Sequence, residues 1–392
     1  MPNIHYGFPY VGGAACAGGV GAPLNTPPMP NPVTLTWAQL MNAQLRLGVY
    51  PAGWILDEIA WRIYSFCIAC APVGVGMVPT VPAVVPAVGM APGAAVGGGF
   101  ANLPPSPVAV GVDSTEKGQL GYHLGTAIGG ALIEYLAGAG GGSLLYPFHL
   151  TRAQANGGVF VLGAQQPDIV IFDVHPATLF VSNFVVWENK GHAAGPAGAA
   201  PLLAALLQAQ SLANMTNWPG NPHIGYAGGG LVGGAGMAPN AYLASMVDSF
   251  FGNYRVQVHD PPSKRPPVPP MSPQSGDNFF AGYYSPYLEA VQSGPNQQSR
   301  QYGGRHFKTV GLAKDVRFGL DQEVVAALRG HGGAGRVSSR IAQALAGGYK
   351  YSASEYLYIH PTGISVELPQ GWLPNRNPLR SSGRAMREVP FD

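Results

Sequence analysis

Apolar positions along the first 70 residues divide the chain into an arm and two helical segments. The first 32 residues are rich in Gly and Pro and predict an extended arm. Residues 36–47 and 54–70 then carry apolar side chains at helical spacing, which predicts two paired helices. Residues 71–112 return to Gly and Pro and predict a linker or an irregular packed loop.

The central segment changes from helical to strand-like spacing. Asp113 or Ser114 can cap a helix that continues to about residue 135 and ends in the AGAGGGS run. Three runs rich in β-forming residues follow, and then an apolar helical face and one weak strand candidate. These later elements are expected over 144–151, 159–174, 179–190, 202–215 and 223–226. The order of helix, three strands, helix and strand predicts an α/β fold.

The remaining residues predict a separate α+β module. The PPSKRPPVPPMSPQSG stretch, residues 261–276, is typical of a linker in polyproline conformation. Helices are expected over 322–328 and 338–346, and strands over 355–359 and 363–367. The predicted domains are therefore 1–112 (arm, helical pair and linker), 113–260 (core) and 261–392 (linker and C-terminal module).

The composition shows that charged residues are scarce in this chain. The chain has 56 Gly and 38 Pro among 392 residues without a collagen period, and 46% hydrophobic residues are ample for a core. Only 10% of residues are charged, so a cluster of charges is informative. Proline interrupts the apolar stretch 71–112 every few positions, and we therefore expect no membrane span.

Basic residues concentrate after residue 254. They are interleaved with aromatic side chains, as in surfaces that contact phosphates, although a solvated basic face explains them equally well. The candidate nucleic-acid-binding residues are Arg300, Arg305, Lys308, Lys314 and Arg317.

Cysteine usage favours a reducing compartment. Cys16, Cys67 and Cys70 cannot form a disulfide framework, and the Cys67/Cys70 pair lacks partners for a zinc site. No basic region precedes an apolar stretch at the N-terminus. We expect a cytoplasmic protein, or one delivered to a target cell without a signal peptide.

The stretch QQPDIVIFDVHPATLFVSNFVVWENKG holds the candidate chemistry. Two β-like runs flank a short HPAT turn and should pair as an antiparallel hairpin. Because side chains alternate along a strand, Glu188 and Lys190 should project from the same face. Asp168 begins the preceding strand, so the hairpin can bring it beside Glu188.

Two carboxylates at this spacing indicate a metal site. Asp168 and Glu188 would repel one another unless a cation lay between them. Such hard oxygen ligands suit Mg²⁺ or Mn²⁺. Lys190 could then orient or deprotonate the attacking water and offset charge on a phosphoryl transition state.

These residues resemble the motif of the PD-(D/E)xK, restriction-endonuclease-like nuclease superfamily. Pro167-Asp168 and Glu188-Asn189-Lys190 match it letter for letter, within about a hundred residues. The resemblance implies a core of helix, three strands, helix and strand. It also implies a glutamate on the first helix, for which Glu116 fits better than Glu134. A glutamine on the later helix is sometimes used, and here Gln210 falls on the apolar stripe, with Gln208 close by.

Nearby residues are given blander roles. We expect Asp173 on the turn side, facing away from Asp168, and expect His175 and His192 to be exposed residues at strand ends. Glu188 and Lys190 themselves could form an ion pair on a solvated sheet face. The apolar neighbours in FVVWENKG argue against a solvated face.

The sequence therefore predicts a metal-dependent nuclease, with DNA favoured over RNA. Its setting could be a bacterial effector toxin with an immunity protein, or a defence enzyme, and a homo-oligomer is compatible with either. The alternative is a catalytically inactive structural or interaction protein on the same core, which the low charge favours. GxSxG, HExxH and EF-hand spacings are absent, which excludes the usual hydrolase and calcium-binding classes.

Overall fold

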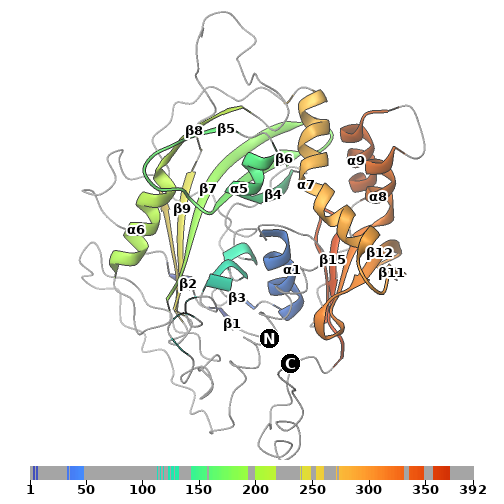
Figure 1. Ribbon diagram of the computed structural model, residues 1–392, viewed down its shortest axis with the longest axis horizontal. Helices are drawn as coiled ribbons and strands as arrows, with labels where there is room; N and C mark the ends of the chain where they lie inside the picture. The colour runs from blue at the N-terminus through green and yellow to red at the C-terminus, as the bar shows by residue number, and fades with distance from the viewer. Residues whose placement is uncertain are drawn as a thin grey trace, which may run out of the picture.

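The computed structural model shows a mixed α/β protein whose strand pairs are mainly antiparallel. Its two larger sheets lie on either side of helix α1 (Trp37–Leu47) (Figure 1). The structure describes residues 3–4, 6–7, 33–34, 36–47, 113, 115, 118, 122–123, 125–127, 129–131, 143–156, 159–192, 199–217, 239, 241–248, 253–259, 271, 273–330, 335–347 and 356–370.

The six-stranded sheet has the strand order β2-β10-β9-β7-β6-β4. Strands β4, β6 and β7 form an antiparallel meander, and β9 joins β7 in parallel. A parallel neighbour needs a crossover connection, which α6 (Ala199–Gln210) supplies. The strands are β2 (Tyr6–Gly7), β4 (Leu144–His149), β6 (Ile169–His175), β7 (Phe180–His192), β9 (Ala241–Asp248) and β10 (Asn253–His259).

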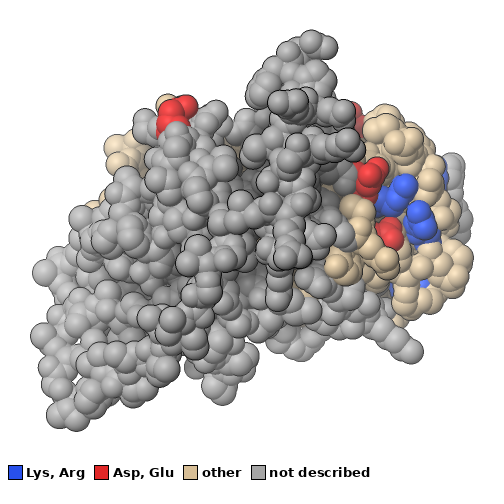
Figure 2. All heavy atoms as spheres, turned by 90° about the horizontal axis from the view of Figure 1, so that it is seen from below, with Lys and Arg blue, Asp and Glu red and all other residues tan. Residues whose placement is uncertain are grey.

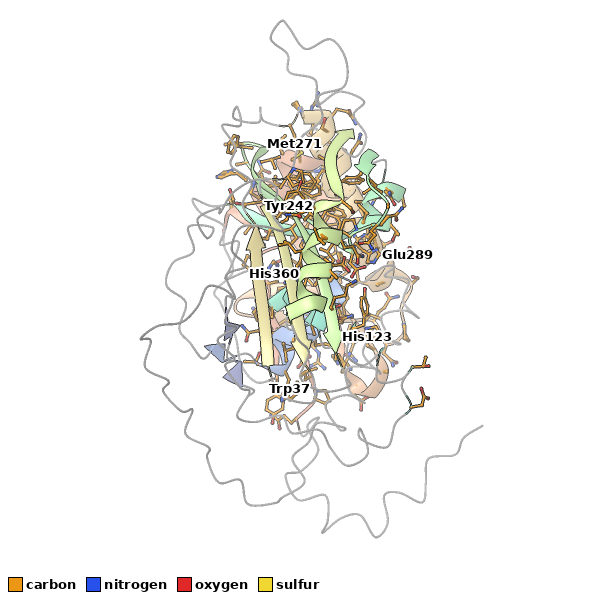
Figure 3. The ribbon with its side chains drawn as sticks, turned by 90° about the vertical axis from the view of Figure 1, so that its left-hand side faces the viewer. Trp37, His123, Tyr242, Met271, Glu289 and His360 are labelled. Carbon is orange, nitrogen blue, oxygen red and sulfur yellow. The ribbon has the colours of Figure 1, made fainter. Side chains whose placement is uncertain are left out.

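The central segment follows the expected order with two corrections. The run 159–174 is not one strand, because β5 (Val159–Leu162) leaves the main sheet and pairs with β8 (Leu212–Asn217). The helix expected over 202–215 ends at Gln210, and its last residues belong to β8. Tyr242 of β9 donates its hydroxyl hydrogen to Leu212 O at 3.1 Å (Figure 3), so the two sheets are tied together.

The start of the core helix agrees with its predicted cap. The described residues among 115–131 are helical, and Asp113 Oδ1 accepts a hydrogen bond from Thr115 N at 2.6 Å. A short helix, α5 (Leu150–Ala155), follows β4 and was not expected. The strand candidate 223–226 lies outside the described residues, and β9 is the first strand of the six-stranded sheet after α6.

Helix α1 confirms the prediction over 36–47 and is buried on all sides. Thr36 and Gln39 form a reciprocal capping box, with Thr36 N donating to Gln39 Oε1 at 2.7 Å and Gln39 N donating to Thr36 Oγ1 at 3.1 Å. Inside the protein Asn42 accepts from Arg46 Nε and donates to Ile364 O, so these two buried side chains have partners. The second predicted helix, 54–70, and the cysteines lie outside the described residues.

Helix α7 (Pro273–Ser293) corrects the expected linker, because residues 273–276 are already helical. Its aromatic side chains recur at intervals of four residues and pack edge-on against Tyr146 of β4. The aromatic residues that contact Tyr146 are Phe279, Phe280, Tyr283 and Tyr284. The C-terminal part of the chain thus packs directly against the strands of the central segment.

The five-stranded sheet has the antiparallel order β11-β12-β13-β15-β14. Three of its strands were not predicted, whereas β14, β15, α8 and α9 agree with the sequence to within about two residues. The elements are β11 (Gln298–Tyr302), β12 (Arg305–Gly311), the 3₁₀ turn η1 (Ala313–Asp315), β13 (Arg317–Asp321), α8 (Gln322–Arg329), α9 (Val337–Ala346), β14 (Leu357–Ile359) and β15 (Ile364–Glu367).

One buried cluster joins residues from all three predicted segments, among them Leu40, Phe172 and Phe318. The domain boundaries at 112 and 260 fall outside the described residues and stay predictions. In the arm, β1 (Asn3–Ile4) pairs with β3 (Val33–Thr34). Among the described residues, no helix combines the length and apolar character needed to cross a membrane.

Candidate metal and phosphodiester site

The β6–β7 hairpin brings Asp168 and Glu188 together, as the sequence predicted. Ile169 and Trp187 are cross-strand partners, so the residues just beyond them meet at the same end of the hairpin. Asp168 N donates a hydrogen bond to Glu188 Oε2 at 2.9 Å. Glu188 is completely buried (0% exposed), and Asp168 is half-buried. The hairpin therefore places an acid pair at the boundary between core and solvent.

Lys190 completes the cluster from the same face of β7. Its Nζ donates to Glu188 Oε1 and to Gln208 Oε1, the latter at 2.8 Å. Its side chain is 37% exposed, so the ammonium is partly open to solvent, unlike the carboxylate that it contacts. The period of two along a strand explains why Glu188 and Lys190 share this position.

Burial disfavours the state in which Asp168 and Glu188 are both ionised. It is the main cause that raises the pKa of Glu188 to about 7, and the charge of Asp168 raises it further. The pKa of Asp168 is also raised by burial, although Lys190 and a hydrogen bond with Glu188 oppose the rise. Near neutral pH, the half-buried carboxyl of Asp168 and the buried carboxyl of Glu188 thus compete for one proton, while a single ammonium lies beside them.

Gln208 is the glutamine of α6 that reaches the site. The expectation that Gln210 takes this role is corrected, since residues two apart on an α-helix point about 200° away from each other. Gln208 Nε2 also donates to Gln166 O at 2.6 Å. Its carboxamide therefore bridges Lys190 and the loop that leads into Asp168.

Tyr122 is a site residue that sequence reasoning missed. It belongs to the helical residues among 115–131, and its pKa is raised by burial and by the negative charge of Asp168, with Glu188 contributing less. A Cβ at Gly125, one turn further on, would overlap Asn189 Nδ2, so glycine lets this helix approach β7 closely. The sequence feature that could have indicated this site is Gly125, one helical turn after Tyr122.

The same helical segment contacts α1. Gln44 Nε2 and His123 Nδ1 lie 3.1 Å apart, and His123 packs edge-on against the Tyr122 ring (Figure 3). Glu116, the glutamate expected near the metal, lies outside the described residues, as does Glu134.

Asp173 requires a correction. It lies within β6 and is buried, rather than on a turn or loop, because the strand extends two residues beyond it. His175 ends β6 and accepts a hydrogen bond from Thr178 N at 3.3 Å, which closes the HPAT turn. His192 is the last residue of β7. The two histidines lie at strand ends, but His175 is half-buried rather than exposed, and the side chain of His192 lies outside the described residues.

Strand β4 pairs with β6 on the side opposite β7, and His149 is its last residue. This histidine is the cross-strand partner of Ile169 and caps α5 by accepting a hydrogen bond from Thr151 N. Burial lowers its pKa to about 4, so the imidazole is neutral at physiological pH.

The basic residues of the C-terminal sheet fall into two groups. Arg305 is held by ion pairs to Asp321 at 2.7 Å and Glu323 at 2.9 Å, which favours a role in the fold. Arg300 is exposed on β11, and Lys308 and Arg317 are half-buried on β12 and β13. Lys314 lies in η1, and its side chain lies outside the described residues. Figure 2 shows acidic and basic side chains next to one another on this side of the molecule.

No protein family, curated protein or solved structure matches this chain. The residues of the site themselves therefore carry the argument.

The donor set fits a hard divalent cation better than a soft one. Among the described residues, no group of three or more His, Cys, Asp and Glu side chains is placed to hold a metal. The acid pair instead supplies two carboxylates, whose pKa values are raised mainly by burial. Oxygen ligands of this kind, completed by water and substrate phosphate, suit Mg²⁺ or Mn²⁺.

Proposed function

We propose that the chain is a metal-dependent nuclease that hydrolyses phosphodiester bonds of nucleic acid, with DNA preferred over RNA. One observation carries the proposal: Asp168, Glu188 and Lys190 converge at one end of a buried hairpin, and the acid pair competes for a proton. In a chain with 10% charged residues, such a cluster has little structural purpose. Perturbed carboxyl pKa values cluster at functional sites.

The order of elements supports the same proposal. A helical segment, β4, β6, β7, α6 and β9 occur in the order that the PD-(D/E)xK resemblance implies. The acid pair and lysine lie on β7 and at the start of β6, where that motif expects them. The additional elements α5, β5 and β8 are insertions on this order.

Each residue of the site has a defined part in the proposed reaction. Asp168 and Glu188 would hold the cation, and Gln208 fixes the Lys190 ammonium through a 2.8 Å hydrogen bond. A bound divalent cation would supply positive charge that favours ionisation of water and offsets charge on the phosphoryl oxygens. Lys190, with its exposed side, would orient the attacking water and stabilise the transition state.

The proposed biological setting is that of an effector toxin or a defence enzyme. In the first case an immunity protein would protect the producing cell, and in the second the C-terminal sheet would help to choose the DNA site. Among the five candidate residues, Arg300 is the one whose described side chain is exposed, whereas Arg305 is occupied by acids.

The test is cleavage of plasmid DNA in Mg²⁺ or Mn²⁺, with an EDTA control. We expect metal-dependent cutting by the wild-type chain and a loss of at least about a hundredfold in Lys190→Ala, since it removes transition-state stabilisation. Arg340→Ala, which removes a half-buried basic residue of α9, is the control and should retain activity.

An absence of cutting of supercoiled, linear and single-stranded DNA and of RNA by the folded wild-type protein would overturn the proposal. Such a result would favour the alternative, a structural or interaction protein in which Lys190 and Glu188 form an ion pair.

A further inference from the structure

A proline inside α7 leaves one backbone carbonyl without its helical partner. Pro286 lies within the helix and has no N–H, so Gly282 O cannot accept the usual hydrogen bond from four residues further on. A buried carbonyl without a donor is costly. Some other group has to supply that donor.

Two side chains of the α5 segment supply it. Arg152 Nη2 donates to Gly282 O at 3.3 Å, and Asn156 Nδ2 donates to the same oxygen at 3.4 Å. A Cβ at Gly282 would lie 3.0 Å from Asn156 Cγ, so a larger residue there would require the Asn156 side chain to shift. The α5 segment therefore supplies the donors that Pro286 cannot provide to Gly282 O.

Arg152 is committed to this contact. It is 4% exposed, donates to Tyr283 O and to Tyr287 Oη, the latter at 3.2 Å, and lies over aromatic rings. The ring centroids of Phe148, Tyr283 and Tyr287 are 5.1 to 5.7 Å from its guanidinium carbon. Among the described residues, its hydrogen-bond partners belong to α7 and none is a carboxylate.

The opposite end of α5 contacts the proposed metal ligand. Leu150 N, at the first residue of α5, donates to Asp168 O at 2.8 Å. Only one residue, Thr151, lies between Leu150 and Arg152. The backbone of Asp168 is therefore connected to α7 through less than one turn of helix.

We propose that Arg152 is a positioning residue for Asp168, and that it binds α7 where Pro286 interrupts the helical hydrogen bonds. Through α5, the C-terminal part of the chain holds the first carboxylate in register with Glu188. The consequence for metal binding rests on the proposed function, whereas the mechanical link between Arg152 and Leu150 does not.

The test uses four full-length proteins: wild type, Arg152→Met, Arg152→Met/Pro286→Ala and Arg340→Met. The Pro286→Ala change gives Gly282 O its helical donor again, and so restores α7 without restoring the link to α5. Arg340 lies away from the site and donates to Ala327 O at 3.0 Å. Its substitution controls for the loss of an arginine that has no link to Asp168. The readouts are amide exchange at Leu150, calorimetric Mn²⁺ affinity and the unfolding temperature.

We expect Arg152→Met to speed Leu150 exchange by about tenfold and to weaken Mn²⁺ binding by about tenfold. The double variant should recover the unfolding temperature but keep both defects, and Arg340→Met should show neither. Unchanged Leu150 exchange in Arg152→Met, or recovery of both defects in the double variant, would overturn the proposal. If the wild type binds no Mn²⁺, the metal site fails, while Leu150 exchange still decides whether the link exists.

Discussion

Two charge clusters in this protein use the same residue types in opposite ways. In the C-terminal sheet, Arg305 contacts two acids, and Asp321 is almost fully buried. Both carboxylate oxygens of Asp321 are used, because Oδ2 accepts from Arg305 and Oδ1 accepts from Glu323 N at the start of α8. This cluster stabilises the junction of β12, β13 and α8.

Each cluster has two carboxyls and one cation, but at the end of the β6–β7 hairpin Glu188 is fully buried and Asp168 is half-buried, whereas Glu323 of the other cluster is 68% exposed. The buried carboxyl of the hairpin is less fully compensated, because burial and the charge of Asp168 raise the pKa of Glu188 to about 7. The comparison teaches that the presence of ion pairs does not reveal function. The informative feature is whether the charges of a cluster are compensated.

The Arg305 cluster should be the more costly to break. We expect Arg305→Ala to lower the free energy of unfolding by about 3 to 5 kcal/mol, because it leaves the buried Asp321 without its partner. Chemical denaturation measures this change. Glu323→Ala is the matched control: Glu323 is 68% exposed, and its loss should cost less than about 1 kcal/mol. Equal losses in the two variants would contradict this view of the cluster.

At the end of the β6–β7 hairpin, removing a charge should raise the free energy of unfolding rather than lower it. The pKa of Glu188 is 4.5 in the unfolded chain and about 7 in the folded protein, so the folded state holds a proton that the unfolded state has released. The free energy of unfolding of the metal-free protein should therefore fall as the pH rises from 4.5 to 7.

Glu188→Gln should remove this fall and raise stability at pH 8 by about 1 kcal/mol. Thermal unfolding in EDTA at pH 5 and pH 8 checks both statements. A variant that is less stable than the wild type at pH 8 would show that the Lys190 ion pair outweighs the repulsion between carboxyls.

The smallest effect is expected on the exposed face of the C-terminal sheet. Arg300→Ala should change the free energy of unfolding by less than about 0.5 kcal/mol, because the side chain is exposed on β11. If this face contacts phosphates, DNA affinity should fall and its dependence on salt should decrease by about one charge. An unchanged salt dependence would favour the solvated basic face.

The hairpin could be predicted because local rules determine it. The short HPAT turn joins two apolar runs, and their pairing, with one bulge between Asp173 and Val174, places Asp168 opposite Glu188. The capped starts of α1 and of the helical segment after Asp113 follow from side-chain chemistry within four residues. Such features need no knowledge of distant contacts.

Long-range packing decided the elements that the sequence did not reveal. Helix α7 was hidden by its prolines, although Phe279, Tyr283 and Tyr287 recur at intervals of four residues. Strands β5 and β8 pair across 50 residues of chain, and their separation from β6 depends on that pairing. The choice of Gln208 over Gln210 depended on the rotation of α6 against β7, which apolar spacing fixes only coarsely.

The central claim is that Asp168 and Glu188 bind a divalent cation, and calorimetric titration with Mg²⁺ and Mn²⁺ at several pH values tests it most directly. Because binding must release the proton that the pair shares, affinity should rise by about tenfold per pH unit below pH 7 and level off above it. Binding should disappear in Asp168→Ala. A folded wild-type protein that shows no binding, or an affinity that Asp168→Ala leaves unchanged, would contradict the account.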